Sequence, residues 1–556
     1  MKKNNLILIL CIFAILGEFF VILATRKVNF FDRNIQHRYE DEVVTNIVSA
    51  NLTRKIFPPS TRLRPLINDY KNLDWFEYPK WQHIPPLYTY VPLLAYKIDG
   101  QVSFETKRLS YFALEILTAL ALIIGLHYIS RSLLFTVSAT LASLVWLSSN
   151  FTQALFFGFT FNESDILLSF FVVLSYLGIC HFFSKPYIKR KEYSLPYLMA
   201  ISAVMALPLI AKSVLGGIPA LVFFTVLLFQ DRNIKHLLYA FGTFVLAVMI
   251  GYLPLFLNDP ALFLQEIRVP FQHFGDYQTW ARPWNFFLTD YLPKDYYSNF
   301  TLIKKFSFTK LWPVFVAVQA IGILALFFRK VTSKTIVIIL GYLFVILNIL
   351  AISLVKSKSP NFAFQSYLIA LFLFAFQFCA FLAFGFSRLK RLLFKKIRIR
   401  LFSIEKYYLP ALTILCSIIL LTMIAVSIDI YKGYGERRAY MDKSPVNGEF
   451  YYLGNQLSKD FGINDLLLIQ PMTGDYTLQD YLLFFTGAET RRMSEFRSIA
   501  FNHDIGFGEI KNRYQKICVI SKKGSPVVQP LYEKNINGYQ ISCINKNIEN
   551  NLLANE

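Results

Sequence analysis

The chain has 556 residues, of which 55% are hydrophobic and only 17% are charged, and its mean hydropathy is +0.42. A soluble protein of this length carries far more polar surface, so the composition excludes that class and indicates an integral membrane protein. The formal net charge is +21, but most basic residues cluster in short connections between apolar runs. That distribution is typical of cytoplasmic loops beside anionic lipid, and it argues against a nucleic-acid-binding groove.

Apolar runs long enough to cross a bilayer as helices recur along the chain. The first, residues 6–25, follows MKKNN and precedes no small-residue cleavage site, so it is interpreted as an uncleaved span rather than a signal peptide. Ten more spans are expected, at roughly 109–128, 133–149, 165–183, 194–211, 214–230, 236–256, 311–328, 335–354, 363–386 and 408–430.

The segment PPLYTYVPLLAYKIDG (85–100) is too short in apolar residues for a clear span and contains three prolines. If it does not cross, the basic connections at 185–191, 231–236, 329–334 and 387–400 share the side of Lys2 and Lys3. The positive-inside rule favours this choice, which makes the segment an external juxtamembrane helix and gives eleven spans. The N-terminus is then cytoplasmic in a cell membrane, and residues 26–108, 257–309 and 431–556 are extracytoplasmic.

The polar tail, 431–556, follows a membrane domain formed by residues 1–430. Its pattern predicts helices over NGEFYYLGNQLSKDFG and TLQDYLLFFTGA, and strands at LLLIQP (466–471), KICVIS and YQISCIN. We expect a small α/β domain without a nucleotide-binding glycine pattern. Cys518 and Cys543 are free to pair if this domain lies outside the cytoplasm.

Two acidic groups stand at the external side of this topology. Asp41 and Glu42 belong to a carboxylate cluster that opens a predicted helix after the first span. Asp165 lies at the external mouth of a span, with Glu163 two residues earlier. Acidic residues in a first helical turn also complement the helix dipole, so a structural role is an equal alternative for Asp41 and Glu42 and, on the residue alone, the more frequent role for Asp165.

Basic residues also occur on the external side. Lys212 lies between two short spans, near the bottom of an outward-facing cavity, although a lysine there also snorkels to the interface. Arg108 is at the external start of a span, and Lys356 and Lys358 occupy a short external turn against the charge bias. Anionic phosphate is the ligand such groups suit, with phospholipid headgroups as the structural alternative.

The order of these segments resembles GT-C glycosyltransferases that use polyprenyl-phosphate sugars. The likeness is to the branch with aminoarabinose lipid A transferase and relatives of protein O-mannosyltransferases, and it covers about residues 1–370. The matching pieces are Asp41–Glu42, PPLY (85–88) with Gly100 and Arg108, Asp165, AKSVLG (211–216) and KSKSPNFAFQSYLIAL (356–371).

This sequence departs from the family pattern at three positions. His83–Ile84 stands where members often carry Glu-Lys, and Ser213 replaces a glycine after the lysine. In the family that Glu can bind a metal, so either His83 replaces it as a ligand of a divalent ion or the metal site is absent. No other cofactor is implied.

The resemblance implies a glycosyltransferase whose donor is a polyprenyl-phosphate sugar and whose acceptor is an extracytoplasmic lipid, glycan or protein. Asp41 is the candidate base for the acceptor hydroxyl, with Asp165, Glu42 and Glu163 orienting the acceptor or a basic partner. Lys212, Arg108, Lys356 and Lys358 would neutralise the leaving phosphate. A one-step displacement inverts the anomeric carbon. A flippase of lipid-linked saccharides, a ligase or polymerase using undecaprenyl-diphosphate glycans, and a structural subunit remain as alternatives.

Overall fold

The structure is a computed structural model of the whole chain. It describes residues 2–31, 49–54, 86–148, 163–184, 194–212, 216–231, 233–258, 320–324, 332–353, 364–395, 448–470, 476–502, 512–522, 532–536 and 538–543, with a few single positions between them. The chain divides into two compact units, one of Met1–Phe30, Tyr111–Leu253 and Ile267–Ala439, the other of Phe31–Ser110, Pro254–Glu266 and Tyr440–Glu556.

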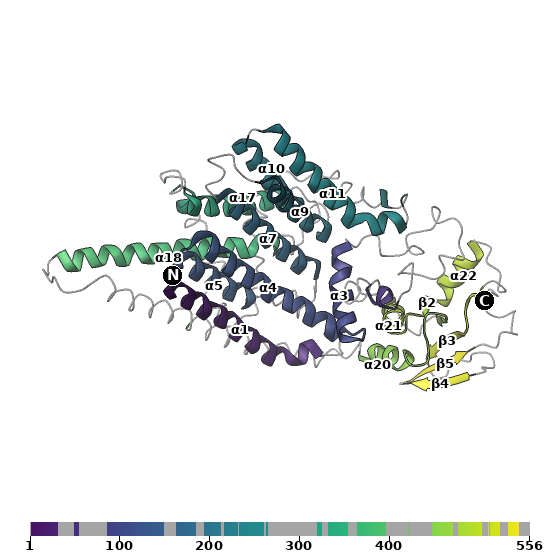
Figure 1. Cartoon of the computed structure of the whole chain (residues 1–556). Helices are drawn as coiled ribbons and strands as arrows, with labels where there is room; N and C mark the ends of the chain where they lie inside the picture. The colour runs from purple at the N-terminus through teal and green to yellow at the C-terminus, as the bar shows by residue number, and fades with distance from the viewer. Residues whose placement is uncertain are drawn as a thin grey trace. The chain divides into compact units, whose positions relative to one another are not determined.

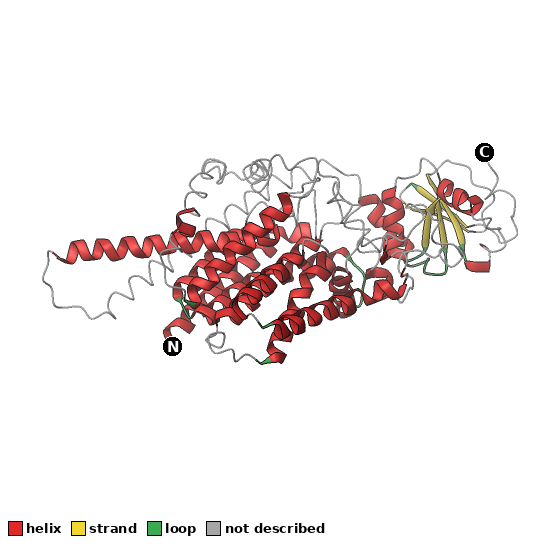
Figure 2. Cartoon of the chain, turned by 90° about the horizontal axis from the view of Figure 1, so that it is seen from above, coloured by secondary structure: helices red, strands yellow, loops and turns green. Residues whose placement is uncertain are grey.

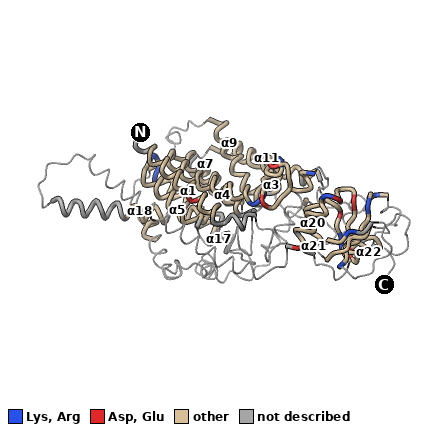
Figure 3. The backbone as a smooth tube through the Cα atoms, turned by 90° about the horizontal axis from the view of Figure 1, so that it is seen from below, with Lys and Arg blue, Asp and Glu red and all other residues tan. Residues whose placement is uncertain are grey.

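The first unit is a bundle of apolar helices (Figure 1). The helices with residues in it are α1 (Lys2–Phe31), α4 (Phe104–Ser130), α5 (Leu133–Ser148), α7 (Glu163–Ser184), α9 (Leu195–Lys212), α10 (Ile218–Asp231), α11 (Ile234–Asn258), α17 (Ser333–Ser353) and α18 (Phe364–Lys395). Charged residues are sparse along the parts of these helices that Figure 3 draws in colour. Helical segments that are apolar on all sides are typical of segments that lie in hydrocarbon.

Four helical segments among the described residues are long and apolar enough to cross a membrane: Asn5–Ala24, Phe104–Ser130, Ile166–Ser184 and Ile234–Pro254. Five shorter apolar helices coincide with predicted spans, at Leu133–Leu147, Leu195–Ala211, Ile218–Phe229, Lys334–Asn348 and Ser366–Phe381. The spans predicted at 311–328 and 408–430 fall almost wholly outside the described residues. The structure therefore describes a helical, membrane-embedded unit, while the count of eleven spans stays a prediction.

The second unit contains a five-stranded mixed sheet (Figure 2). Its strands are β1 (Leu466–Ile469), β2 (Glu489–Arg492), β3 (Ile517–Lys522), β4 (Tyr532–Ile536) and β5 (Tyr539–Cys543), in the order β2-β1-β3-β5-β4. The strands β2, β1 and β3 are parallel, whereas β5 is antiparallel to both β3 and β4. The helices α20 (Gly448–Leu457), α21 (Tyr476–Thr486) and α22 (Met493–Asn502) accompany the sheet.

Local sequence located most of these elements. The helices predicted around 447–462 and 477–488 are α20 and α21, and the three predicted strands are β1, β3 and β5. The strands β2 and β4 were not predicted, because ETRR and YEKNI lack the apolar alternation of a buried strand, and the helix α22 was not predicted either. Cys518 and Cys543 face each other across β3 and β5 and form a disulfide.

One face of the sheet is covered by a core cluster that reaches beyond the tail. Leu467, Ile469 and Ile520 pack there with side chains of α20 and α21. The same cluster includes Ala50 and Phe104, which precede the sheet by about 400 residues in the sequence. Phe104 stacks on Phe484 with ring centroids 4.4 Å apart. The segment after the first span and the start of α4 therefore share a hydrophobic core with the tail.

Candidate functional site

Arg108 is placed by a tight turn between two helices of the second unit. The helix α3 (Pro86–Asp99) ends at Gly100, which has φ of +78° and donates its N–H to the Tyr96 carbonyl at 2.9 Å. A glycine adopts this left-handed backbone without steric cost, which is how many helices end. Ser103 then caps α4, because its Oγ accepts the Thr106 N–H at 3.1 Å. The interval between PPLY and Arg108 in the sequence is thus occupied by the helix α3, a turn at Gly100 and the capped start of α4.

Arg108 and its neighbour Lys107 are both buried, at 8% and 0% exposure. The Arg108 guanidinium carbon lies 5.9 Å from the centroid of the Phe104 ring, one turn earlier in α4. Phe104 is itself held by Phe484 of α21. The tail helix therefore packs on the ring that supports Arg108, and a cation–π contact adds to its orientation.

Residues 49–54 form a short helical segment within the region where the sequence predicts a helix. Ser49 donates its Oγ–H to the Thr89 carbonyl of α3 at 2.8 Å. Arg54 donates through Nη2 to the Phe485 carbonyl at the end of α21, also at 2.8 Å. Its Nη1 is buried and has no hydrogen-bond partner among the described residues. Burial lowers the pKa of Arg54 to about 10.

In the first unit, α7 and α9 pack antiparallel. The Ser175 Oγ–H donates to the Val204 carbonyl at 3.5 Å, and the His181 and Tyr197 rings lie 5.8 Å apart, edge to face. Residue numbers thus rise along α7 as they fall along α9. An α-helix rises 1.5 Å per residue, so Asp165 lies about 15 Å from Ser175 along α7. Lys212 lies about 12 Å from Val204 along α9. Because the helices are antiparallel and Ser175 contacts Val204, both displacements run in the same direction. The two predicted site residues therefore lie at the same end of the helix pair.

Gly216, four residues after Lys212, lies very close to the backbone of α9. Pro208 has no N–H to donate to the Val204 carbonyl, which explains why Ser175 supplies that hydrogen bond. A Cβ on Gly216 would lie 2.0 Å from the Pro208 carbonyl oxygen. Only glycine fits there, so the Gly216 backbone lies directly against the last turns of α9. The residues on either side of Lys212 that make this contact are Pro208 and Gly216.

The described residues test the predicted site only in part. The structure places Arg108 in the second unit, and places Glu163 and Asp165 in the first turn of α7 and Lys212 at the end of α9. The remaining predicted site residues, Asp41, Glu42, His83, Lys356 and Lys358, lie outside the described residues. Among the side chains that the structure describes, no group of three or more His, Cys, Asp or Glu could hold a metal ion.

Three polar groups that could serve a functional site were not predicted from the sequence. Arg54 is one, partly buried but with a buried Nη1 atom. Glu115 of α4 and Asn348 of α17 are both 1% exposed, and the Glu115 Oε1 and both Asn348 amide atoms have no hydrogen-bond partner in the described part of the chain. The sequence carried a signal for the last two, because each lies inside an apolar run, where polar groups are expensive.

The comparisons with known proteins agree with this architecture. No family model and no curated protein matches the sequence. Among solved structures, ArnT from Cupriavidus metallidurans bound to undecaprenyl phosphate matches with a TM-score of 0.56 at 13% identity, over 97% of this chain and 99% of that one. The apo state of the same protein matches with a TM-score of 0.51 at 14% identity, over 95% of this chain and 98% of that one. The apo oligosaccharyltransferase of Archaeoglobus fulgidus gives 0.50 at 13% identity, over 93% of this chain and 69% of that one.

These likenesses define the fold. The chain has the fold of GT-C membrane glycosyltransferases, as the order of its motifs predicted. At 13–14% identity the likeness extends to architecture and not to individual side chains. The roles of Asp41, Arg108, Asp165 and Lys212 are therefore argued below from chemistry.

Proposed function

We propose that this chain is an integral membrane glycosyltransferase that moves a sugar from a polyprenyl-phosphate donor to an extracytoplasmic acceptor, which is a lipid, a glycan or a protein. One observation carries the proposal. The chain shares its fold with a protein that was solved with undecaprenyl phosphate bound. Within that fold, Asp165 and Lys212, an acidic and a basic residue of the predicted site, lie at the same end of the α7–α9 pair.

The topology that suits this reaction has eleven spans and a cytoplasmic N-terminus. Residues 1–430 form the catalytic membrane domain, and residues 431–556 form an extracytoplasmic α/β domain. The Cys518–Cys543 disulfide supports the external placement of this domain, because disulfides persist in oxidising compartments. Nucleotide sugars are cytoplasmic, so a transferase that acts outside needs a donor carried by a lipid.

The reaction is a single displacement at the anomeric carbon. The acceptor oxygen attacks that carbon as its proton passes to the Asp41 carboxylate, while the bond from the carbon to the phosphate oxygen breaks. Polyprenyl phosphate leaves with the bonding electrons, and the configuration inverts. Asp165, with Glu42 and Glu163 in support, orients the acceptor or a basic partner.

The leaving phosphate is already a weak base, so it needs charge neutralisation more than a proton. We assign this role to Lys212, Arg108 and the Lys356–Lys358 turn. Arg54 is a further candidate in the second unit, since its buried Nη1 has no partner among the described residues. His83 is proposed as the ligand of a divalent ion, should the reaction use one, where related enzymes carry a glutamate.

The test measures transfer of a radiolabelled sugar from undecaprenyl phosphate to a membrane extract that serves as the acceptor pool. We expect transfer by the wild-type protein, loss of at least about a hundredfold in Asp41→Asn, and a smaller loss in the adjacent control Glu42→Gln. Transfer retained in a folded Asp41→Asn protein would remove the assigned base. Movement of the labelled lipid across liposomes without covalent transfer would favour a flippase instead.

A further inference from the structure

We propose that the carboxyl edge of the sheet between β1 and β3, at Gln470 and Ser521, is a saccharide-binding site that holds the acceptor glycan. The proposal deepens the function proposed above and rests on it for the role of the ligand as acceptor. The site itself is argued from the sheet and its side chains.

The strand order creates a topological switch point. From β1 the chain passes through α21 to β2 on one side, and from β2 it passes through α22 to β3 on the other side. All three strands are parallel, so their carboxyl ends meet at one edge. In open α/β sheets, ligands bind outside the carboxyl ends of the strands where the order reverses, which here is between β1 and β3.

Two polar side chains lie at this edge. The Gln470 N–H donates to the Ile520 carbonyl at 3.0 Å and extends the β1–β3 pairing by one residue, which brings Gln470 beside Ser521. Because side chains alternate along a strand, both point to the face opposite the cluster that contains Ile469 and Ile520. Ser521 is fully buried.

The oxygen atoms of these side chains lack partners. Neither Gln470 Oε1 nor Ser521 Oγ, both buried, accepts or donates a hydrogen bond within the described part of the chain. Buried polar groups in proteins are paired almost without exception, by protein, water or ligand. The Gln470 Oε1 and Ser521 Oγ atoms, which lie on neighbouring residues at the switch point, could therefore form hydrogen bonds with a hydroxyl-bearing ligand.

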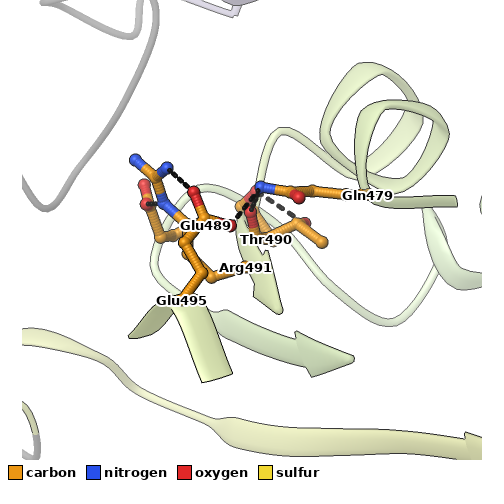
Figure 4. Close-up of polar contacts among 6 residues, drawn as sticks. Gln479, Glu489, Thr490, Arg491 and Glu495 are labelled. Carbon is orange, nitrogen blue, oxygen red and sulfur yellow. Dashed lines mark hydrogen bonds and ion pairs between the residues drawn. The ribbon is translucent and has the colours of Figure 1, made fainter. Parts of the chain in front are cut away.

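Two other ligand classes fit the described part of this edge less well. Arg491, which lies on the same face of the sheet, is already bound by Glu489 at 2.8 Å and by Glu495 at 3.0 Å, so it is not available to a phosphate (Figure 4). An extended peptide needs an unpaired strand edge, but β1 and β3 are central strands with neighbours on both sides. A neutral ligand with several hydroxyl groups, a saccharide, fits what remains.

The test uses the full-length protein in a detergent without a sugar headgroup and with no lipid-linked donor. Neutral trisaccharides of glucose, mannose and N-acetylglucosamine are titrated, and binding is measured by saturation-transfer NMR. We expect at least one to bind the wild-type protein, and its affinity to fall about tenfold in Gln470→Leu and in Ser521→Ala. Ser542→Ala is the matched control, because Ser542 on β5 is also fully buried with an unpaired hydroxyl in the described region, but lies farther from this edge.

The outcomes separate the site from the reaction. Binding that Ser521→Ala weakens and Ser542→Ala preserves supports the site. Failure of every trisaccharide to bind, or equal affinity in the two serine variants, overturns it and leaves ordered water as the partner of these oxygens. Because binding is measured without donor, Lys212→Met, which changes a residue assigned to the donor phosphate, should bind the same trisaccharide while losing transfer. A protein that binds glycans but transfers no sugar would refute the proposed reaction and keep the site.

Discussion

Gly216 and Gly217 offer a direct test of how the turn after Lys212 is held. The two glycines are adjacent, yet a Cβ at Gly216 would lie 2.0 Å from the Pro208 carbonyl oxygen, whereas at Gly217 the nearest atom is the Leu209 Cδ1 at 3.8 Å. Neither has a positive φ, so alanine is compatible with the backbone at both positions. The pair differs in available space.

The expected magnitude follows from the overlap. A carbon and a carbonyl oxygen approach to about 3.3 Å, so Gly216→Ala must move backbone by more than about 1 Å. Overpacking of this kind costs about 1–3 kcal/mol of stability. A catalytic group displaced by about 1 Å can lose about a hundredfold in rate, and Pro208, which the new methyl group would displace, lies about one turn before Lys212 in α9. Gly217→Ala should change both quantities little.

The assay compares the thermal unfolding of both variants in detergent with their rates of sugar transfer from undecaprenyl phosphate. We expect Gly216→Ala to be less stable and about a hundredfold slower, and Gly217→Ala to match the wild-type protein. If Gly216→Ala were as stable and as active as Gly217→Ala, the close approach of this turn to Pro208 would be wrong. A stable but slow Gly216→Ala protein would still support the placement of Lys212.

Three further predictions concern the second unit. Arg491→Met should destabilise it by about 3–5 kcal/mol, because the buried Glu489 and the partly buried Glu495 lose their cation. Lys534→Met removes a partly exposed ion pair and should cost less than about 1 kcal/mol. Hydrogen exchange of the strand amides measures both effects, and equal opening in the two variants would contradict the prediction. The Cys518–Cys543 disulfide joins residues that are 25 positions apart, and its reduction should lower the free energy of unfolding by about 3–4 kcal/mol in denaturant titrations. An unchanged unfolding transition after reduction would show that the disulfide does not stabilise the sheet. The pKa of Arg54 is lowered to about 10, so from about pH 10 to about pH 12 the folded state binds fewer protons than the unfolded state. The free energy of unfolding of the wild-type protein, relative to that of Arg54→Met, should therefore rise with pH in that window. A difference that stays constant with pH would refute the burial of the Arg54 charge.

The fold class followed from local properties of the sequence. Apolar runs predicted the described membrane helices, because a helix in hydrocarbon satisfies its own backbone and depends little on its neighbours. Alternation and apolar runs in the tail located β1, β3 and β5 for similar reasons. The strands β2 and β4 were not predicted, because their own residues do not alternate between apolar and polar. They form strands because they pair with β1 and β5.

The candidate site was less accessible to sequence reasoning. Asp165 and Lys212 were found as charges at the ends of apolar runs, but nothing in either run states that they share one end of a helix pair. Likewise, Arg54 looks like an ordinary loop arginine until its contact with the Phe485 carbonyl, more than 400 residues later, is seen.

The sequence by itself indicated a membrane protein with a set of charged site candidates and a fold of the GT-C kind, since hydropathy, helix length and motif order are properties of consecutive residues. Only the tertiary structure decided the antiparallel register of α7 and α9, the passage of Gly216 over Pro208, the entry of Phe104 into the core of the tail, and the neighbouring positions of Gln470 and Ser521. Each of these depends on which distant surfaces pack together, and a one-dimensional pattern of polarity is compatible with many such packings.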